Sequence, residues 1–465
     1  MRASLLVFAG LLGLAAATQV VKLWSSSDML GWALKVGVPA CGAVACVLCL
    51  RFSDTAMQNA VLAIYSVAVS LLIGDAIIVL LPPPLTHQQA LWQAWQASGI
   101  SGDHRTVTQV VRDLRSEGVA AYPKLNPSAE LESSNGEAHS RITINGVEIV
   151  ALSTIPDTIS VLCNETGSYV TYTSDERGFN NPPGLWQLPK LEIAFVGDSY
   201  TEGACVPSAE NMVSRVREQI PATMNLGMSG DGPLLELATL SEYLPEKTPT
   251  IVVWEYTEGN DLTDLVDEMR SPILRRYFED GFTQGLVTKQ QLLTTALTDY
   301  ADSAIRDIER GDGEERSKPA SAADFLLLRH LRGYAERALQ PSQIEATKSE
   351  NLQRFRTIAQ KMRARVAAWG GKLVFVYLPS PSRYDKVSRP WMMNNDLLSI
   401  RDDILAIIRE LGISMTDLDR VFRQAENPHS YYASGIGHLS NDGYRAAAEA
   451  IEVTLSSELG SRAGR

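Results

Sequence analysis

Long stretches without charged side chains open the chain. Residues 3–21 hold no charged side chain over 19 positions, and residues 60–81 hold a single carboxylate over 22 positions. Both are long enough to cross a bilayer, since a helix needs about 20 apolar residues to do so. Between them lies another stretch, residues 29–50, which is the second of the three in chain order. It is interrupted only by Lys35, whose long side chain can extend to the membrane interface. We therefore predict a membrane anchor of about three transmembrane helices in residues 1–84.

The charges that flank these stretches predict which side of the membrane the rest of the chain faces. Arg2 precedes the first stretch and Arg51 separates the second from the third, whereas no Lys or Arg follows the third until Arg105. Because basic residues stay preferentially on the cytoplasmic side, three crossings place residues 85–465 outside. In a bacterium this means attachment to the inner membrane with the main body in the periplasm. The residues that run against this orientation are Lys22 and Lys35.

An alternative interpretation of residues 3–21 is a cleaved signal peptide, with the small-residue sequence LAAAT at positions 14–18 as the cleavage site. Two crossings then remain, and the main body is exported only if their orientation still resolves outward. The two alternatives differ in the anchor and share the same exported region.

The acidic balance of the chain excludes one class of partner. The chain has 42 basic and 54 acidic residues, a formal net charge of −12, and no basic tract. Four of the basic and three of the acidic residues lie in the first 84 positions, so the remaining 381 residues carry −13. Nucleic-acid binding depends on basic side chains that neutralise phosphates. We therefore predict no nucleic-acid partner, and contact with membrane lipid through the N-terminal helices.

Short apolar segments separated by helical patterns indicate an α/β domain over residues 190–460. A parallel sheet between two helical layers accommodates such segments, because its strands are covered on both faces. A charged stretch near residues 262–350 interrupts the alternation as a helical insertion. Residues 85–189 are expected to form a stalk and a small β-containing segment, since Asn-Gly turn chemistry and β-branched runs occur there. The four apolar segments are residues 191–196, 222–226, 250–254 and 372–378.

Polar motifs follow the predicted strands at the edge where the active residues of open α/β sheets collect. Gly197-Asp198-Ser199 comes directly after the first strand, NLGMSG at 225–230 after the second, and EGND at 258–261 after the third. A fourth motif, GHLSNDGY at 437–444, precedes a terminal helix. In this order the four motifs resemble those of the SGNH (GDSL-type) hydrolase superfamily. The resemblance covers roughly residues 190–455 without the insertion.

The resemblance implies serine-dependent ester chemistry without a cofactor or a metal. Ser199 is implied to be the nucleophile, and His438 the base that takes its proton and later protonates the leaving alcohol. The implied oxyanion donors are the backbone N–H of Ser199, the backbone N–H of Gly230 and the side-chain amide of Asn260. Taken singly, each residue has a structural alternative, such as a helix N-cap for Ser199 or a core position for His438. Taken together, the motifs favour the catalytic interpretation, with His429 as a weaker candidate for the base.

Two departures from the superfamily pattern concern the residue that orients the histidine and the spacing of the third motif. The superfamily commonly has Asp three residues before the His, and Gly435 occupies that position here. The site is then a Ser-His dyad in which a backbone carbonyl or another carboxylate orients the ring. The carboxylates near enough in sequence are Asp198, Asp417, Asp419 and Asp442, and the sequence does not choose among them. Asp198 is included in the predicted catalytic set with Ser199 and His438. The glycine of the third motif is displaced by one position from Gly-x-Asn-Asp.

Further segments are similar to a membrane-anchored bacterial subgroup of the superfamily that is connected with envelope polysaccharides. The resemblance implies a membrane-anchored esterase that removes O-acyl groups, acetyl above all, from an envelope polysaccharide or exopolysaccharide. The same residues fit an O-acyltransferase to a polysaccharide, or a non-catalytic glycan-binding component that works with polysaccharide-assembly proteins. The segments are residues 163–165, 174–182 and 377–380, with Arg383 and Tyr384.

Several large side chains in or near these segments have two interpretations each. Arg177 and Arg383 are candidates for substrate contacts, with structural salt bridges as the more common role of such residues. The aromatic residues Trp186, Trp254 and Tyr256 can stack on sugar rings, although core packing is the safer expectation.

The five cysteines divide between the two parts of the chain. Three lie in the second apolar stretch without ligand partners, so we expect packing there and no metal site. Cys163 and Cys205 are the pair in the exported region, where a disulfide is permitted. Their spacing does not establish the bond, and Cys205 as a nucleophile is the less favoured alternative.

Overall fold

The computed structural model describes residues 54–80, 87–310, 347–384, 395–433 and 437–463, with a few isolated positions between 6 and 47. The described residues divide into two compact units, one that contains residues 54–80 and one that contains residues 87–310, 347–384, 395–433 and 437–463. The predicted crossings at 3–21 and 29–50 lie, apart from those isolated positions, outside the described residues.

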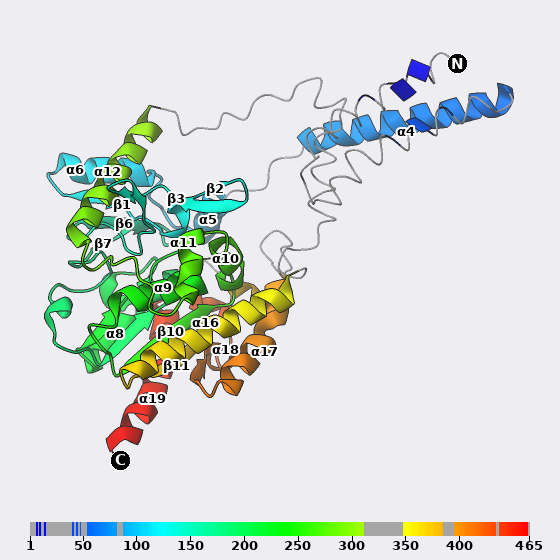
Figure 1. The fold of residues 1–465 in the computed structure, drawn as a ribbon. Coiled ribbons are helices and arrows are strands. Elements are labelled where there is room, and N and C mark those ends of the chain that lie inside the picture. The colour runs from blue at the N-terminus through cyan, green and yellow to red at the C-terminus, as the bar shows by residue number, and fades with distance from the viewer. Residues whose placement is uncertain are drawn as a thin grey trace. The chain divides into compact units, whose positions relative to one another are not determined.

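In the first unit the structure describes one long helix, α4 (Asp54–Leu80), drawn in blue in Figure 1. Its residues Asp54–Asp75 are long and apolar enough to cross a membrane, as judged by length and composition. This helix contains most of the third predicted crossing.

The second unit is built on a five-stranded sheet in which every pair of neighbouring strands is parallel. The strands follow the spatial order β12-β11-β10-β8-β9. They are β8 (Ile193–Val196), β9 (Thr223–Asn225), β10 (Ile251–Thr257), β11 (Lys372–Leu378) and β12 (Ser414–Asp417). The first four match the predicted apolar segments, and β12 is an edge strand that the pattern did not indicate because it is polar and only partly buried.

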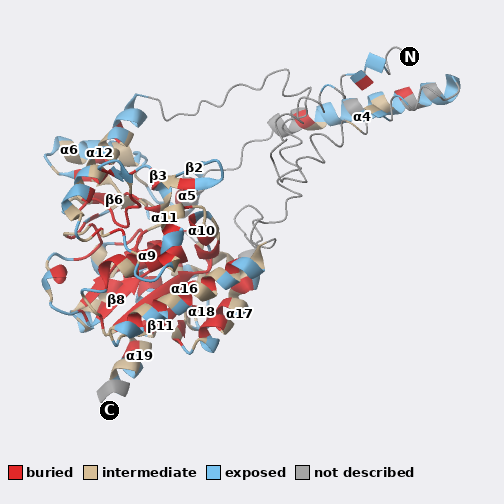
Figure 2. Cartoon of the chain, in the orientation of Figure 1, coloured by how far each residue is buried: buried red, intermediate tan, exposed pale blue. Residues whose placement is uncertain are grey.

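Helices cover both faces of this sheet, so the unit has the predicted three layers (Figure 1). Successive side chains of a strand point to opposite faces, and along β10 Val252 and Trp254 join one apolar cluster while Ile251 and Val253 join the other. Figure 2 shows the sheet as the buried centre of the unit. The first cluster packs on α9 (Pro233–Tyr243), α16 (Lys348–Ala368) and α17 (Asn395–Glu410). The second packs on α8 (Met212–Gln219), α18 (Leu418–Phe422) and α19 (Asn441–Ala463).

The segment before the sheet begins with two helices and continues with short strands, within the same compact unit. Its β1, β6 and β7 form a three-stranded sheet in the order β1-β6-β7. One hairpin turns at Asn145-Gly146, where both residues have positive φ, as the favoured two-residue hairpin turn requires. The elements are α5 (His87–Ser98), α6 (Val107–Ser116), β1 (Ala121–Pro123), β2 (Leu131–Ser134), β3 (Glu137–Ser140), β4 (Thr143–Ile144), β5 (Val147–Glu148), β6 (Ile159–Cys163) and β7 (Val170–Thr173).

The region predicted as a helical insertion contains three α-helices joined by turns and irregular segments in the part that the structure describes, and residues 311–346 lie outside that part. Its helices are α10 (Asp261–Glu268), α11 (Pro272–Arg275) and α12 (Gln290–Glu309). Short helical turns complete the unit: α7 (Ser199–Glu202), η2 (Ser128–Glu130), η3 (Leu185–Gln187), η4 (Ser208–Glu210), η5 (Arg276–Phe278), η6 (Pro381–Tyr384) and η7 (Pro428–Tyr431).

Candidate active site

The strand order places a topological switch point at the carboxyl end of β8. This strand pairs with β9 on one side and with β10 on the other, and the connections that leave β8 and β9 pass over opposite faces of the sheet. Ligands of open α/β sheets bind at such a switch point. Ser199 begins α7 there, directly after β8. A side chain at Gly197 would lie 2.3 Å from the hydroxyl of Thr201, so only glycine allows this tight passage from strand to helix.

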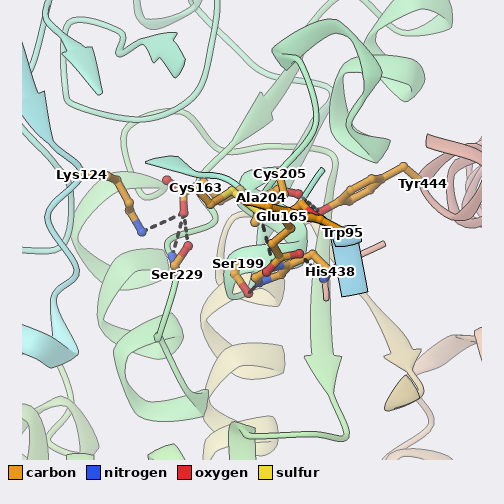
Figure 3. The surroundings of a disulfide bond; sticks show 11 residues. Trp95, Lys124, Cys163, Glu165, Ser199, Ala204, Cys205, Ser229, His438 and Tyr444 are labelled. Carbon is orange, nitrogen blue, oxygen red and sulfur yellow. Dashed lines mark hydrogen bonds and ion pairs between the residues drawn. A yellow bond between two sulfur atoms is a disulfide. The ribbon is translucent and has the colours of Figure 1, made fainter. Parts of the chain in front are cut away.

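Ser199 and His438 are brought together although 239 residues separate them in the chain. His438 Nε2 lies 2.8 Å from Ser199 Oγ, the geometry of a hydroxyl that donates to an imidazole nitrogen (Figure 3). The ring of Tyr200 packs 5.0 Å from the imidazole, centre to centre. His438, and not His429, is therefore the histidine that contacts the predicted nucleophile.

Glu165 occupies the place of the missing aspartate. Its Oε1 lies 2.8 Å from His438 Nδ1, and its Oε2 accepts the backbone N–H of His438 at 2.6 Å. An ionised carboxylate only accepts hydrogen bonds, so Nδ1 carries the ring proton and Nε2 presents the lone pair to Ser199. A side chain at Gly437 would lie 2.2 Å from Glu165 Oε2, so glycine is required for this close approach.

Asp198, which the sequence places in the predicted catalytic set, forms its hydrogen bonds with groups other than His438 within the described residues. Its carboxylate accepts the backbone N–H of Tyr200 at 2.9 Å and the side-chain amide of Asn260 at 3.2 Å. As the residue before α7, Asp198 is held in an N-cap, because the first N–H groups of a helix need an acceptor. Gly435, which stands where the superfamily commonly has an aspartate, lies outside the described residues.

The other carboxylates considered from the sequence pair with basic residues instead of His438. Asp417 and Asp419 bind the guanidinium of Arg401, and Asp442 binds Arg445 at 2.7 Å. Glu165 was missed because it comes from the loop after β6, outside the α/β domain. The one signal for it was its place in the segment 163–165, beside Cys163.

The surroundings of His438 favour its charged form. Burial lowers the pKa of its imidazole, but the negative charge and hydrogen bond of Glu165, together with the charges of Asp198 and Glu202, outweigh burial and raise that pKa above its ordinary value. The histidine that accepts the proton of Ser199 is thus a stronger base than a free imidazole.

The backbone N–H groups of Ser199 and Gly230 are the two predicted oxyanion donors from the main chain. The N–H of Ser199 stands at the first position of a helix, where it has no acceptor within the helix. Gly230 has φ of +80°, and a side chain there would lie 2.5 Å from the hydroxyl of Ser128. Within the described ranges, the hydrogen bonds of the chain include no acceptor for either N–H.

The third predicted donor, Asn260, is engaged with carboxylates. Its amide donates to Asp264 at 2.8 Å and to Asp198 at 3.2 Å. An amide has two hydrogens, so Asn260 reaches an oxyanion only by giving up the longer bond, to Asp198.

Glu202 connects the nucleophile to the loop that carries Gly230. It lies at the end of α7, fully buried, and its carboxylate accepts the backbone N–H of Ser229 at 2.9 Å and the hydroxyl of Ser229 at 2.5 Å. Lys124 approaches the same carboxylate oxygen to 2.8 Å, and Tyr172 donates its hydroxyl to the other at 2.8 Å. The negative charge of Glu202 is therefore balanced within the protein.

The arginines predicted as candidate substrate contacts have structural partners. Arg383 forms an ion pair with Glu258, and Arg177 lies over the ring of Trp186, 4.5 Å from its centre. The three aromatic residues proposed for core packing or sugar stacking are buried, and the indole of Trp254 donates to Glu236 at 2.6 Å. The core-packing alternative is therefore the correct one for Trp186, Trp254 and Tyr256.

Cys163 and Cys205 form a disulfide, with their Cα atoms 5.5 Å apart. The bond joins the end of β6 to the segment after α7, and it removes Cys205 from the list of candidate nucleophiles. In the part of the chain that the structure describes, Glu165, Cys205 and His438 are the one group of potential metal ligands that lie close together. The sulfur of Cys205 is bonded to Cys163, and Glu165 and His438 bind each other. This group therefore does not suit a metal ion.

Comparison with known proteins gives likenesses in structure alone. No family model matches the chain, and no curated protein sequence matches it. A lipase/acylhydrolase from Enterococcus faecalis is similar with 14% identity and a TM-score of 0.31, over 57% of this chain and 95% of the other. A member of the lipolytic protein G-D-S-L family from Veillonella parvula has 12% identity and a TM-score of 0.29, over 57% and 97%. An acetyl xylan esterase has 10% identity and a TM-score of 0.32, over 57% and 98%. We base the chemistry on the geometry of the site and not on these likenesses.

Proposed function

We propose that this protein is a serine esterase of the SGNH (GDSL) type that hydrolyses O-acyl esters. The observation that carries the proposal is the continuous chain of hydrogen bonds from Ser199 through His438 to Glu165, with 2.8 Å at both contacts of the imidazole. A nucleophile, a base and a third group that orients the base are the parts that activate a serine hydroxyl.

The first half of the reaction forms an acyl-enzyme. Ser199 Oγ attacks the carbonyl carbon of the ester while its proton passes to His438 Nε2, and Glu165 stabilises the imidazolium that results. The carbonyl oxygen becomes an oxyanion, for which the N–H groups of Ser199 and Gly230 are the donors. When the tetrahedral intermediate collapses, the bond to the alcohol breaks and His438 gives its proton to the leaving oxygen.

The second half returns the enzyme to its resting state. Water attacks the acyl group on Ser199 with His438 as base, the bond to Ser199 Oγ breaks, and His438 returns the proton to that oxygen. The carboxylic acid leaves. Each oxyanion donor in such a site contributes about 3 kcal/mol to the stability of the transition state, so two donors stabilise it by about 6 kcal/mol.

As the substrate we propose acetyl esters on an envelope polysaccharide or exopolysaccharide, with the protein held in a bacterial inner membrane and its second unit in the periplasm. Support for the location comes from the apolar stretches before residue 85 and from the apolar helix α4. Support for the substrate comes from the segments 163–165, 174–182 and 377–380, which are similar to the polysaccharide-associated subgroup. As partners at this location we propose polysaccharide-assembly proteins.

The chemistry is tested with Ser199→Ala. The variant should lose labelling by a fluorophosphonate probe and lose hydrolysis of p-nitrophenyl acetate, because both require the Ser199 oxygen. Ser241→Ala is the matched control: the hydroxyl of Ser241 donates to the carbonyl of Leu237 within α9, and its loss should leave both signals unchanged. A wild-type protein that neither labels nor hydrolyses would remove the proposal.

Hydrolysis and transfer differ only in whether water or a sugar hydroxyl attacks the acyl-serine. Glycan acetylation in cells that carry wild-type protein or Ser199→Ala separates them. An esterase lowers acetylation relative to the variant, whereas an acyltransferase raises it.

A further inference from the structure

Ser199, His438 and Glu165 form a hydrogen-bonded triad, and Glu165 is the member that lies outside the main sheet and the helices packed on it. Ser199 follows β8 and His438 precedes α19, and both elements are packed in the second apolar cluster. Glu165 instead lies on the loop between β6 and β7 of the small sheet. Its position at His438 therefore depends on whatever holds that loop against the α/β layers.

The first such hold is covalent. Cys163, two residues before Glu165, is bonded to Cys205, which follows the short helix of the nucleophile. The sulfur of Cys205 lies 3.7 Å from His438 Nδ1, the same nitrogen that Glu165 contacts. The disulfide thus holds the start of the loop close to the imidazole that Glu165 contacts (Figure 3).

The second hold comes from α5 and the residues after it. Trp95 is 2% exposed, and its indole N–H donates to the backbone carbonyl of Glu165 at 2.9 Å. Asp103 binds the loop on both sides of Glu165: its carbonyl accepts the amide of Asn164 at 2.7 Å, and its N–H donates to the carbonyl of Gly167 at 2.8 Å. Three hydrogen bonds from this segment therefore converge on residues 164–167.

We propose, on the basis of the function proposed above, that the Cys163–Cys205 disulfide and Trp95 are positioning groups for the esterase reaction, which act on catalysis through the placement of Glu165 on His438. Neither touches the reacting atoms of an ester. The disulfide makes the esterase sensitive to the thiol–disulfide state of its compartment, since a dithiol that reduces the bond by two electrons and two protons leaves two thiols and frees the loop.

The charges that face His438 define a readout that a purely structural role would not move. They are Glu165 from the loop after β6, Asp198 before α7 and Glu202 at the end of α7. Glu165 contributes the largest share of the increase in the pKa of His438. Displacing Glu165 therefore shifts the rising limb of the pH–rate profile to lower pH, because kcat/KM follows the unprotonated base.

The experiment uses the full chain in detergent and measures hydrolysis of p-nitrophenyl acetate against pH. The test proteins are Trp95→Phe, which keeps the ring and loses the N–H, and the double variant Cys163→Ser/Cys205→Ser. We expect kcat/KM to fall about 10- to 100-fold in each variant, since small misplacements of a catalytic group cost rate on that scale. We also expect the rising limb of the pH–rate profile to move to lower pH. Treatment of wild-type protein with dithiothreitol should reproduce the double variant, and the double variant should not respond to dithiothreitol.

Trp369→Phe is the matched control for the indole. The N–H of Trp369 also donates to a backbone carbonyl, that of Pro249 at 3.0 Å, at the opposite, amino-terminal end of the strands. Its loss should leave both the rate and the pH limb as in wild type.

Each change is also made in Glu165→Gln protein. If the disulfide and Trp95 act through Glu165, their loss changes kcat/KM less than twofold in the Glu165→Gln protein, because the carboxylate that they position is already absent. Equal fold-losses in both backgrounds, with an unmoved pH limb, would overturn the proposal and leave the disulfide and Trp95 as general stabilisers.

A second measurement separates this proposal from the proposed function. The protein has six histidines, and ¹³C labelling of their rings lets the titration of His438 be followed by NMR without any substrate. A pKa of His438 that falls in Trp95→Phe or after reduction supports the positioning role even in a protein without esterase activity. A titration unchanged by both treatments contradicts it even if the esterase activity is established.

Discussion

Replacing Glu165 with glutamine tests the interpretation of the site most directly. The carboxylate accepts two hydrogen bonds from His438, one from Nδ1 and one from the backbone N–H. Glutamine offers one acceptor oxygen and one donor NH₂ group, so one of the two contacts becomes a donor facing a donor. The imidazole relieves this by moving its proton to Nε2, and Nε2–H can no longer accept the proton of Ser199.

The size of the effect follows from the charge interaction that is lost. Two unit charges 2.8 Å apart attract by about 6 kcal/mol at an effective dielectric constant of 20. The Glu165 side chain is 6% exposed and that of His438 is 26% exposed, so solvent screens part of this attraction. We expect a loss of about 4 to 5 kcal/mol in the transition state, which corresponds to a fall in kcat/KM of about 10³- to 10⁴-fold.

The assay is hydrolysis of p-nitrophenyl acetate over a range of pH. Because the charge of Glu165 holds the pKa of His438 above its ordinary value, the wild-type rate should rise with pH through that elevated pKa. In Glu165→Gln the limb should move to lower pH while the maximal rate falls. Asp442→Asn, which removes an exposed carboxylate paired with Arg445, is the control and should change neither. Activity within tenfold of wild type and an unmoved limb in Glu165→Gln would refute the assignment of Glu165.

Two further predictions concern the packing around the site. Gly437→Ala places a methyl group 2.2 Å from Glu165 Oε2, so kcat/KM should fall about 100-fold with the melting temperature changed by only a few degrees; an unchanged rate would contradict the contact. Lys124→Met leaves the charge of Glu202 buried without its partner and should lower the free energy of unfolding by about 3 to 5 kcal/mol in urea. A loss below 1 kcal/mol would show that Glu202 does not depend on Lys124.

The elements of the α/β domain could be predicted from the sequence where local pattern specifies them. Segments covered on both faces must be apolar throughout, and this identified β8, β9, β10 and β11. Polar residues directly after such strands pointed to Ser199, and a helix start after a histidine pointed to His438. The edge strand β12 was not predicted, because a strand with one open side needs no continuous apolar run, and Ser414–Asp417 has none.

The residue that orients His438 shows where local pattern stops. The resemblance indicated that Gly435 stands where an aspartate is common, and the sequence could not choose among Asp198, Asp417, Asp419 and Asp442 as its replacement. Glu165 stands 273 positions before His438, on a loop of another sheet. No periodicity or spacing relates two such residues, since their meeting depends on how the small sheet packs on the α/β layers.

The amino-acid order was thus enough to establish an apolar start and a parallel sheet with polar motifs at its carboxyl edge, because short-range pattern and chain direction specify them. The pairing of Ser199 with His438 was implied by the resemblance of those motifs to SGNH hydrolases. The carboxylate that binds His438, the hydrogen bond of Asn260 to Asp198 and the pairing of Cys163 with Cys205 emerged from the folded chain. Each is a contact between segments that lie far apart in sequence, and such contacts are set by packing in three dimensions.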